Sequence, residues 1–202
     1  MQLLNALHDS VVHSRRVDSL TKGLIPMLPE AGSVLDVGCG DGWLASLLAE
    51  QLPLSQFCGI DVLVRPDTHI SIAHFDGVEI PYPDHHFDTV MMVDVLHHTG
   101  DPAILLREAK RVARNFVVLK DHTRDGLAAR ATLRMMDWIG NAHHGVALPY
   151  NYLSHSEWRQ LFDSLDLTID QWNAKPRLYG APVDWFCGRS LHFLARLTVG
   201  NN

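Results

Sequence analysis

The stretch V-L-D-V-G-C-G-D-G-W, residues 34–43, determines how the rest of the chain is organised. Residues 34–37 have strand character, and three glycines follow at alternate positions, Gly38, Gly40 and Gly42. The helical pattern W-L-A-S-L-L-A-E-Q-L then begins at once. Such a turn places bare backbone amides beside a helix N-terminus, and glycine leaves room for a ligand against the main chain. We therefore expect a ligand site here, the alternative being a tight turn without a ligand.

Residues 56–61, Q-F-C-G-I-D, form a second predicted strand, which ends in a carboxylate. Asp61 lies nineteen residues after Gly42, close to the offset at which an acidic residue reaches a ribose hydroxyl pair. An ionised carboxylate accepts hydrogen bonds from both hydroxyls of a vicinal diol. We therefore expect Asp61 to contact the ligand, the alternative being a surface aspartate that ends a strand.

The remaining pattern alternates strands with helices, which indicates an α/β fold in a single domain over residues 1–202. The apolar run at 87–93 suits a strand buried on both faces. The segment V-L-V-R-P-D-T after Asp61 is too short for a full helix, so the second crossover looks abbreviated. Asp101-Pro102 predicts a helix start, and Ser154-x-x-Glu157 is a capping box. Further strands are expected at 70–74, 116–120, 167–172 and 191–197, and helices at 2–28 (within an N-terminal helical segment, 1–30), 42–52, 103–113, 127–139 and 157–165.

Composition narrows the class of protein. The chain has 202 residues, 47% of them hydrophobic, and a formal charge of −6 with no basic run, which argues against nucleic acid as the main partner. Cys39, Cys58 and Cys187 are odd in number and form no C-x-x-C motif, so no disulfide framework is expected. The N-terminus lacks signal-peptide features, and no run of 18 apolar residues occurs. We expect a cytoplasmic protein without a membrane span; the oligomeric state is not indicated.

Together these residues resemble the class I S-adenosylmethionine-dependent methyltransferases, over residues 34–99. V-L-D-V-G-C-G-D-G is similar to that family's cofactor motif, and G-I-D to its ribose-binding strand end. The run F-D-G-V-E-I-P-Y-P-D-H-H-F-D-T-V-M-M-V-D-V-L-H-H, residues 75–98, resembles quinone-pathway and related small-molecule methyltransferases. The resemblance implies a Rossmann-like α/β fold: a seven-stranded, mostly parallel sheet with a last antiparallel strand and helices on both faces.

The resemblance also implies a set of residues that bind S-adenosylmethionine, with S-adenosylhomocysteine as product. The residues that would line the methionine and ribose part of the cofactor are Asp36, Gly38, Cys39 and Gly40. Those that would hold the ribose hydroxyls and the adenine are Asp61, Val62, Asp76, Gly77 and Val78. Those that would lie near the amino-acid end of the cofactor are Asp94 and Val95. The abbreviated crossover after Asp61 departs from the family pattern, and the contact that this departure affects most is that of Val62 with the adenine.

The sequence also bears on four other interpretations: a P-loop protein, a dinucleotide-dependent oxidoreductase, a metal site and a non-catalytic protein. No Gly-Lys pair exists, which excludes a P-loop, and no tyrosine is followed four residues later by lysine, which disfavours a dinucleotide-dependent oxidoreductase. No metal is expected, because H-E-x-x-H is absent and neighbouring side chains in extended chain point apart, as at His97-His98. A non-catalytic protein that binds S-adenosylmethionine or serves as an interaction partner stays open.

Methyl transfer from a sulfonium is an in-line displacement, and some acceptors require a general base. The candidates are His97, His98 and His122, with His122 first because Asp121 and the following loop are expected to face the acceptor; a surface histidine is the alternative. Residues 122–155 are predicted to form an acceptor cap. Its lining would include Met135, Met136, Trp138, Leu148, Tyr150 and Tyr152, and His143 and His144 could contact substrate. The alternative is that much of this segment is simply core; if it is a cap, we expect a small, partly apolar acceptor. The family's N-P-P-Y type signature for amino-nitrogen acceptors is absent after the fourth strand, where D-V-L-H-H stands, which argues against nucleic-acid bases and protein glutamine as acceptors.

Arg15-Arg16 on the first predicted helix has two interpretations. The simpler is a solvated helix face, and the other is a role in gripping an anionic group over the site.

Overall fold

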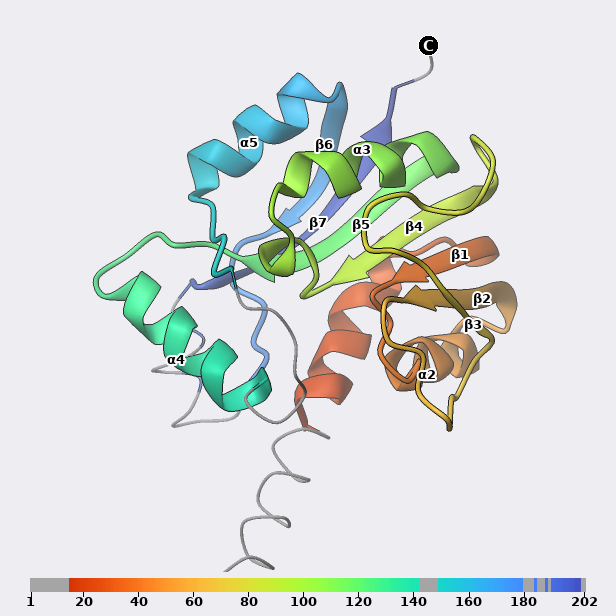
Figure 1. Ribbon diagram of the computed structural model, residues 1–202, viewed down its shortest axis with the longest axis horizontal. Helices are drawn as coiled ribbons and strands as arrows, with labels where there is room; N and C mark the ends of the chain where they lie inside the picture. The colour runs from red at the N-terminus through yellow and green to blue at the C-terminus, as the bar shows by residue number, and fades with distance from the viewer. Residues whose placement is uncertain (1–14, 142–148, 180–183, 185–187, 189, 201–202) are drawn as a thin grey trace, which may run out of the picture.

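A computed structural model describes residues 15–141, 149–179, 184, 188 and 190–200 (Figure 1). Its centre is a seven-stranded sheet in the order β3-β2-β1-β4-β5-β7-β6. Strand β7 runs antiparallel to both β5 and β6, and every other neighbouring pair is parallel. The predicted sheet with a last antiparallel strand is therefore confirmed. The strands are β1 Ala31–Val37, β2 Leu54–Asp61, β3 Ile72–His74, β4 Phe87–Val93, β5 Ala113–His122, β6 Leu167–Asn173 and β7 His192–Val199.

Four helices begin close to where the sequence signals place them: α2 Trp43–Gln51, α3 Pro102–Val112, α4 Ala129–Asn141 and α5 His155–Ser164. The Asp101 side chain accepts a hydrogen bond from the Ala103 amide, and the Ser154–Glu157 capping box is formed in both directions. The helix predicted at 2–28 is described from residue 15; it runs to residue 24 and tightens into a 3₁₀ turn, η1 Ile25–Met27, which carries Pro26. Its first part, residues 2–14, lies outside the described residues.

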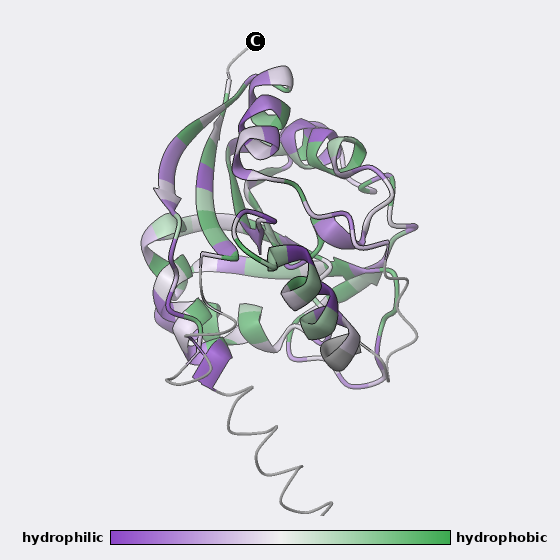
Figure 2. Ribbon diagram, turned by 90° about the vertical axis from the view of Figure 1, so that its left-hand side faces the viewer, coloured by the Kyte–Doolittle hydropathy of each residue, from purple (hydrophilic) through white to green (hydrophobic). Residues whose placement is uncertain are grey.

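Apolar side chains fill both faces of the sheet, which explains the continuous apolar run in β4. Val90 and Met92 belong to the core shared with α3 and α5, whereas Met91 belongs to the core shared with the 15–24 helix and α2. This is the alternation that a strand imposes on its side chains. Figure 2 shows the apolar strands between the helical layers. The expected helices on both faces are thus confirmed.

The crossover between β2 and β3 contains no helix, as predicted. Three apolar side chains that follow β2 are consequently exposed: Val62 by 55%, Leu63 by 60% and Val64 by 39%. The carboxyl end of β2 is therefore left open beside the glycine turn.

The segment after β5 lies beyond the carboxyl ends of β4 and β5 (Figure 1). Helix α4 is attached there through a small core of Ala129, Leu133, Tyr152 and Leu191, while Met135 and Trp138 are exposed. Among the described residues, no helix is long and apolar enough to cross a membrane.

Candidate active site

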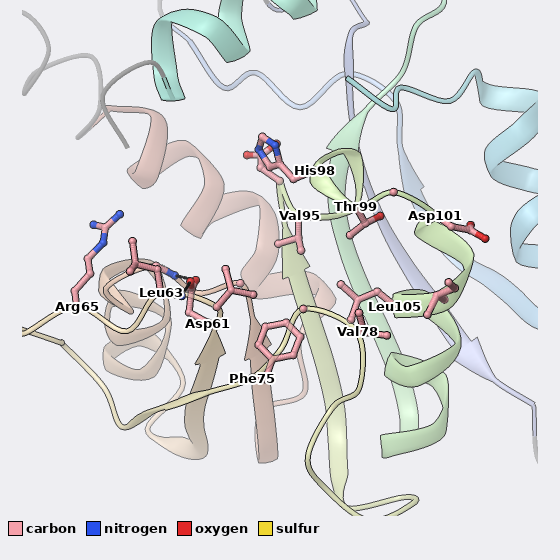
Figure 3. A pocket seen from close by; sticks show the side chains of 17 residues that line it. Asp61, Leu63, Arg65, Phe75, Val78, Val95, His98, Thr99, Asp101 and Leu105 are labelled. Carbon is pink, nitrogen blue, oxygen red and sulfur yellow. Dashed lines mark hydrogen bonds between the residues drawn. The ribbon is translucent and has the colours of Figure 1, made fainter. Parts of the chain in front are cut away.

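A cavity of about 820 Å³ opens where the parallel strands end (Figure 3). Its walls come from the turns that follow four strands, β1, β2, β3 and β4, and from the start of α3. Open α/β sheets bind ligands at this edge. The lining residues are Gly38, Gly40, Asp61, Val62, Leu63, Arg65, Phe75, Gly77, Val78, Asp94, Val95, His98, Thr99, Gly100, Asp101, Ile104 and Leu105.

The three glycines after β1 adopt positive φ angles, for which a Cβ is unfavourable: 70° at Gly38, 64° at Gly40 and 78° at Gly42. A Cβ on Gly38 would lie 2.6 Å from Val95 Cγ2, and one on Gly42 would lie 2.4 Å from Ile70 Cγ1. At Gly40 a Cβ would meet nothing within 4 Å. Two glycines therefore permit close packing, and Gly40 presents bare backbone to the cavity.

The carboxylate of Asp61 is held in the cavity wall by two backbone amides. Its Oδ2 accepts a hydrogen bond from Gly40 N at 2.8 Å, and its Oδ1 accepts one from Leu63 N at 2.9 Å. A carboxylate oxygen has a further lone pair, so two amide contacts leave acceptor capacity for a ligand. The end of β2 and the glycine turn thus form one structural unit, while contact of Asp61 with a ribose stays a prediction.

Three predicted cofactor residues do not line the cavity. Asp36 is buried within β1, where burial and then the nearby Asp61 raise its pKa to about 8. Cys39 packs its Sγ against Gly59, and Asp76 turns its Oδ1 back to the amides of Val78 and Glu79 at 2.8 Å each. Of the other predicted cofactor residues, Gly38, Gly40, Asp61, Val62, Gly77, Val78, Asp94 and Val95 all line it.

Asp94 lines the cavity with its carboxylate already paired. Lys120 binds its Oδ1 and Arg16 binds its Oδ2. Burial alone would raise the Asp94 pKa, but Lys120 and then Arg16 hold it well below its usual range. Asp94 also has a φ of 59°, uncommon for a residue with a side chain. Arg16 is thus no solvated helix residue; the anion that it grips is Asp94.

The three candidate bases lie in different environments. His122 and Asp121 are 5% and 1% exposed, and neither lines the cavity, so the base role of His122 stays a prediction. They are buried because β5 continues to His122, which is covered by His97, Tyr152 and His192. Burial, Lys120 and His97 lower the His122 pKa to about 4. Of the three histidines, only His98 lines the cavity.

His97 is buried between two aspartates, Asp121 and Asp137, and the sequence did not predict either contact. Its Nδ1 lies 2.7 Å from Asp121 Oδ1, and its Nε2 lies 3.6 Å from Asp137 Oδ1. Burial lowers the His97 pKa, but Asp121 and then Asp137 raise it more, to about 10. His97 and His98 also differ from the expected extended pair, because they lie in a 3₁₀ turn, η2 Leu96–His98, with ring centroids 4.0 Å apart.

Two residues of this site, Lys120 and Asp137, were missed. Both are buried. A lysine that ends the apolar run F-V-V-L-K was a signal for an acidic partner, because lysine is almost never fully buried unless paired. Asp137 gave no such signal within the polar sequence of α4. None of the described residues of the 122–155 segment lines the cavity, while Leu148, His143 and His144 lie outside the described residues, so the cap stays a prediction.

The cavity, with its glycine turn and strand-end carboxylate, thus lies at the edge where a Rossmann-like sheet binds nucleotide-like ligands. A family model described as a methyltransferase domain matches residues 12–171. The chain therefore belongs to the methyltransferase domain family.

Similar proteins agree with this assignment. The chain is 34% identical over 110 residues to 27-O-demethylrifamycin SV methyltransferase from Amycolatopsis mediterranei, covering 47% of this chain and 40% of that protein. It is 27% identical over 161 residues to 2-methyl-6-phytyl-1,4-hydroquinone methyltransferase from Synechocystis, covering 75% and 43%. It thus spans less than half the length of these relatives. The structure of a Mesorhizobium loti S-adenosylmethionine-dependent methyltransferase has a similar fold, with TM-score 0.65, 18% identity and coverage of 88% and 96%.

Proposed function

We propose that this chain transfers the methyl group of S-adenosylmethionine to a small, partly apolar acceptor and releases S-adenosylhomocysteine. The observation that carries the proposal is the cavity of about 820 Å³ that joins the glycine turn to Asp61. Its size lies within the range of small-molecule sites. Its position at the carboxyl ends of the parallel strands is where the fold binds nucleotide-like ligands.

The lining residues fit S-adenosylmethionine better than a phosphorylated nucleotide. Gly40 offers open backbone, and Asp61 offers a carboxylate suited to the ribose hydroxyls. Phe75, near Asp61, and Val78, near Leu105, supply apolar surface to the same cavity (Figure 3). Among the described lining residues, Arg65 is the one cation, and it lies 3.5 Å from a carboxylate oxygen of Asp41. Such a wall offers little to balance the charge of a pyrophosphate.

S-adenosylmethionine supplies an activated methyl group that an acceptor atom displaces in line. The chain's own contribution is to position the two molecules and to exclude water between them. Ile104, Leu105 and Val95 form an apolar wall on the α3 side of the cavity, next to His98 and Thr99. This is the part of the cavity that we assign to the acceptor.

The apolar wall and the curated relatives both support a small, partly apolar acceptor. The names of the two curated relatives specify small molecules, 27-O-demethylrifamycin SV and 2-methyl-6-phytyl-1,4-hydroquinone. Of the three histidines, His98 is the one placed to touch an acceptor, whereas a base role for His97 or His122 would require contact that their burial prevents in this conformation.

The experiment replaces Asp61 by alanine and measures S-adenosylmethionine binding by calorimetry. We expect a loss of about 1.5–3 kcal/mol, roughly 10- to 150-fold in Kd, since hydrogen bonds to a charged group are removed. Asp67→Ala is the matched control, because Asp67 is exposed in the same crossover. An unchanged affinity in Asp61→Ala would remove the ribose assignment.

Turnover separates an enzyme from a binding protein. The chain is incubated with methyl-labelled S-adenosylmethionine and either hydroquinones and phenols or bulk tRNA, and labelled product and S-adenosylhomocysteine are counted. Label transfer to the small molecules supports the proposal. Transfer to tRNA alone would contradict the acceptor class, and binding without transfer to any acceptor would favour the non-catalytic alternative.

A further inference from the structure

A cluster of three possible metal ligands lies beside the cavity, between η2 and α4. Ligand atoms of His97, His98 and Asp137 all lie within 4.8 Å of one another. His97 Nε2 and Asp137 Oδ1 are 3.6 Å apart, which is long for a hydrogen bond. Two ligands at about 2.0–2.1 Å from a tetrahedral zinc ion are roughly 3.4 Å apart. The observed separation is therefore close to that of two atoms sharing an ion.

We propose that His97, His98 and Asp137 form a binding site for a divalent transition-metal ion. Two imidazoles and one carboxylate make a donor set that suits zinc, and three protein ligands leave a coordination position open. The adjacent histidines can converge because η2 is a 3₁₀ turn and not extended chain.

Contacts around the ligands orient them as in known metal sites. His97 Nδ1 lies 2.7 Å from Asp121 Oδ1, which leaves Nε2 for an ion. Asp121 is itself fixed, because its Oδ2 accepts a hydrogen bond from Leu96 N at 3.0 Å. The hydroxyl of Tyr152 donates to Asp137 Oδ2, so Oδ1 faces His97. A carboxylate behind a ligating histidine fixes its tautomer and makes it a better ligand.

His98 supplies an independent indication of a ligand. Its Nδ1 is buried and has no hydrogen-bond partner within the described part of the chain. A buried nitrogen without a partner is costly unless something absent from the structure satisfies it. An ion bound by this nitrogen would satisfy it. The rings of His97 and His98 are already 4.0 Å apart.

A second group with metal-binding geometry, Asp94, His97 and His122, is a poorer site. Lys120 and Arg16 both bind the Asp94 carboxylate, so two positive charges would repel a cation there. The positive charges of Lys120 and Arg16 are paired with Asp94, whereas His97 lies beside the carboxylates of Asp121 and Asp137. The negative charge therefore favours the site on the α4 side.

The free coordination position of the ion could bind the acceptor, an inference that rests on the proposed function. His97 and Asp137 are 2% and 6% exposed, whereas His98 lines the cavity. An acceptor in the cavity could therefore reach the ion with a hydroxyl oxygen. The oxygen would bind the ion and release its proton to solvent, which leaves a better nucleophile. The acceptor class is then narrowed to molecules with a phenol or alcohol group.

The test is metal binding by the full chain, measured apart from activity. Metal-free protein is titrated with Co²⁺, whose visible absorption reports coordination, and zinc retained after gel filtration is measured by mass spectrometry. We expect one equivalent of zinc, displacing Co²⁺. His98→Ala and Asp137→Asn should each weaken binding at least tenfold, and Asp121→Asn about 10- to 100-fold. His69→Ala is the control, because His69 is exposed in the β2–β3 crossover.

Each result supports or overturns the inference. Wild-type protein that retains no zinc and gives no Co²⁺ spectrum would overturn it, leaving His97 as an imidazolium between two aspartates. Binding that survives in both His98→Ala and Asp137→Asn would also overturn it, because the ion would be elsewhere. S-adenosylmethionine binding measured on the same samples separates the two proposals: cofactor binding without metal refutes this inference alone, and metal binding without cofactor refutes the proposed function alone.

Discussion

Gly40→Ala should separate the stability of the fold from binding at the site. Gly40 has a φ of 64°, where a residue with a Cβ pays about 1–2 kcal/mol. No atom lies within 4 Å of the added Cβ, so a clash with the protein adds nothing to this cost. The methyl group points instead into the cavity, where it keeps a ligand from the backbone. We expect S-adenosylmethionine to bind at least tenfold more weakly, a loss of about 1.4 kcal/mol or more.

Gly126→Ala is the matched control. Gly126 has a φ of 114° and also has nothing within 4 Å of an added Cβ, but it does not line the cavity. Urea denaturation should show destabilisation in both variants, and calorimetry should show weakened binding in Gly40→Ala alone. Unchanged affinity in Gly40→Ala, or equal losses in both variants, would refute the assignment of Gly40 to the cofactor wall.

Two further predictions concern stability. Because the folded-state pKa of Asp36 is raised from 3.8 to about 8, the folded chain keeps a proton that the unfolded chain loses, so this residue lowers stability as pH rises across that interval. The advantage of Asp36→Asn over wild type in urea denaturation should therefore grow by up to about 3 kcal/mol between pH 5 and 7; a constant difference would contradict the raised pKa. Arg111 donates hydrogen bonds to the carbonyls of Ile80 and Tyr82 and so connects the loop after β3 to α3. In urea denaturation, Arg111→Ala should lower the free energy of unfolding by about 1–3 kcal/mol. Arg107 is exposed on the same helix, and Arg107→Ala should lower that free energy by less than about 0.5 kcal/mol. Equal losses of unfolding free energy in the two arginine variants would show that the Arg111 hydrogen bonds do not stabilise the fold.

The parts of the site that are local in sequence could be predicted from it. Gly38, Gly40 and Gly42 follow one strand directly, and their backbone angles are set by that turn. Asp61 ends the neighbouring strand, and parallel pairing of β1 with β2 brings it to Gly40. Strand periodicity and helix-capping residues gave most element positions for the same reason.

Parts that depend on long-range packing could not be predicted. Asp94 meets Arg16 and Lys120 across 78 and 26 residues of sequence. His97 meets Asp137 only because α4 lies over the ends of β4 and β5. The burial of His122 was not predicted for a related reason: two residues of additional strand in β5 carried it into the buried sheet. Such contacts depend on where elements dock, which residue spacing alone does not specify.

The most direct measurement is a crystal structure of the chain with S-adenosylhomocysteine, the product that the proposed reaction leaves in the cavity. The prediction is that its ribose hydroxyls lie within hydrogen-bond distance of the Asp61 carboxylate, with the ligand against Gly40 and its sulfur toward His98. Density outside this cavity, or an unoccupied cavity at saturating ligand, would contradict the assignment.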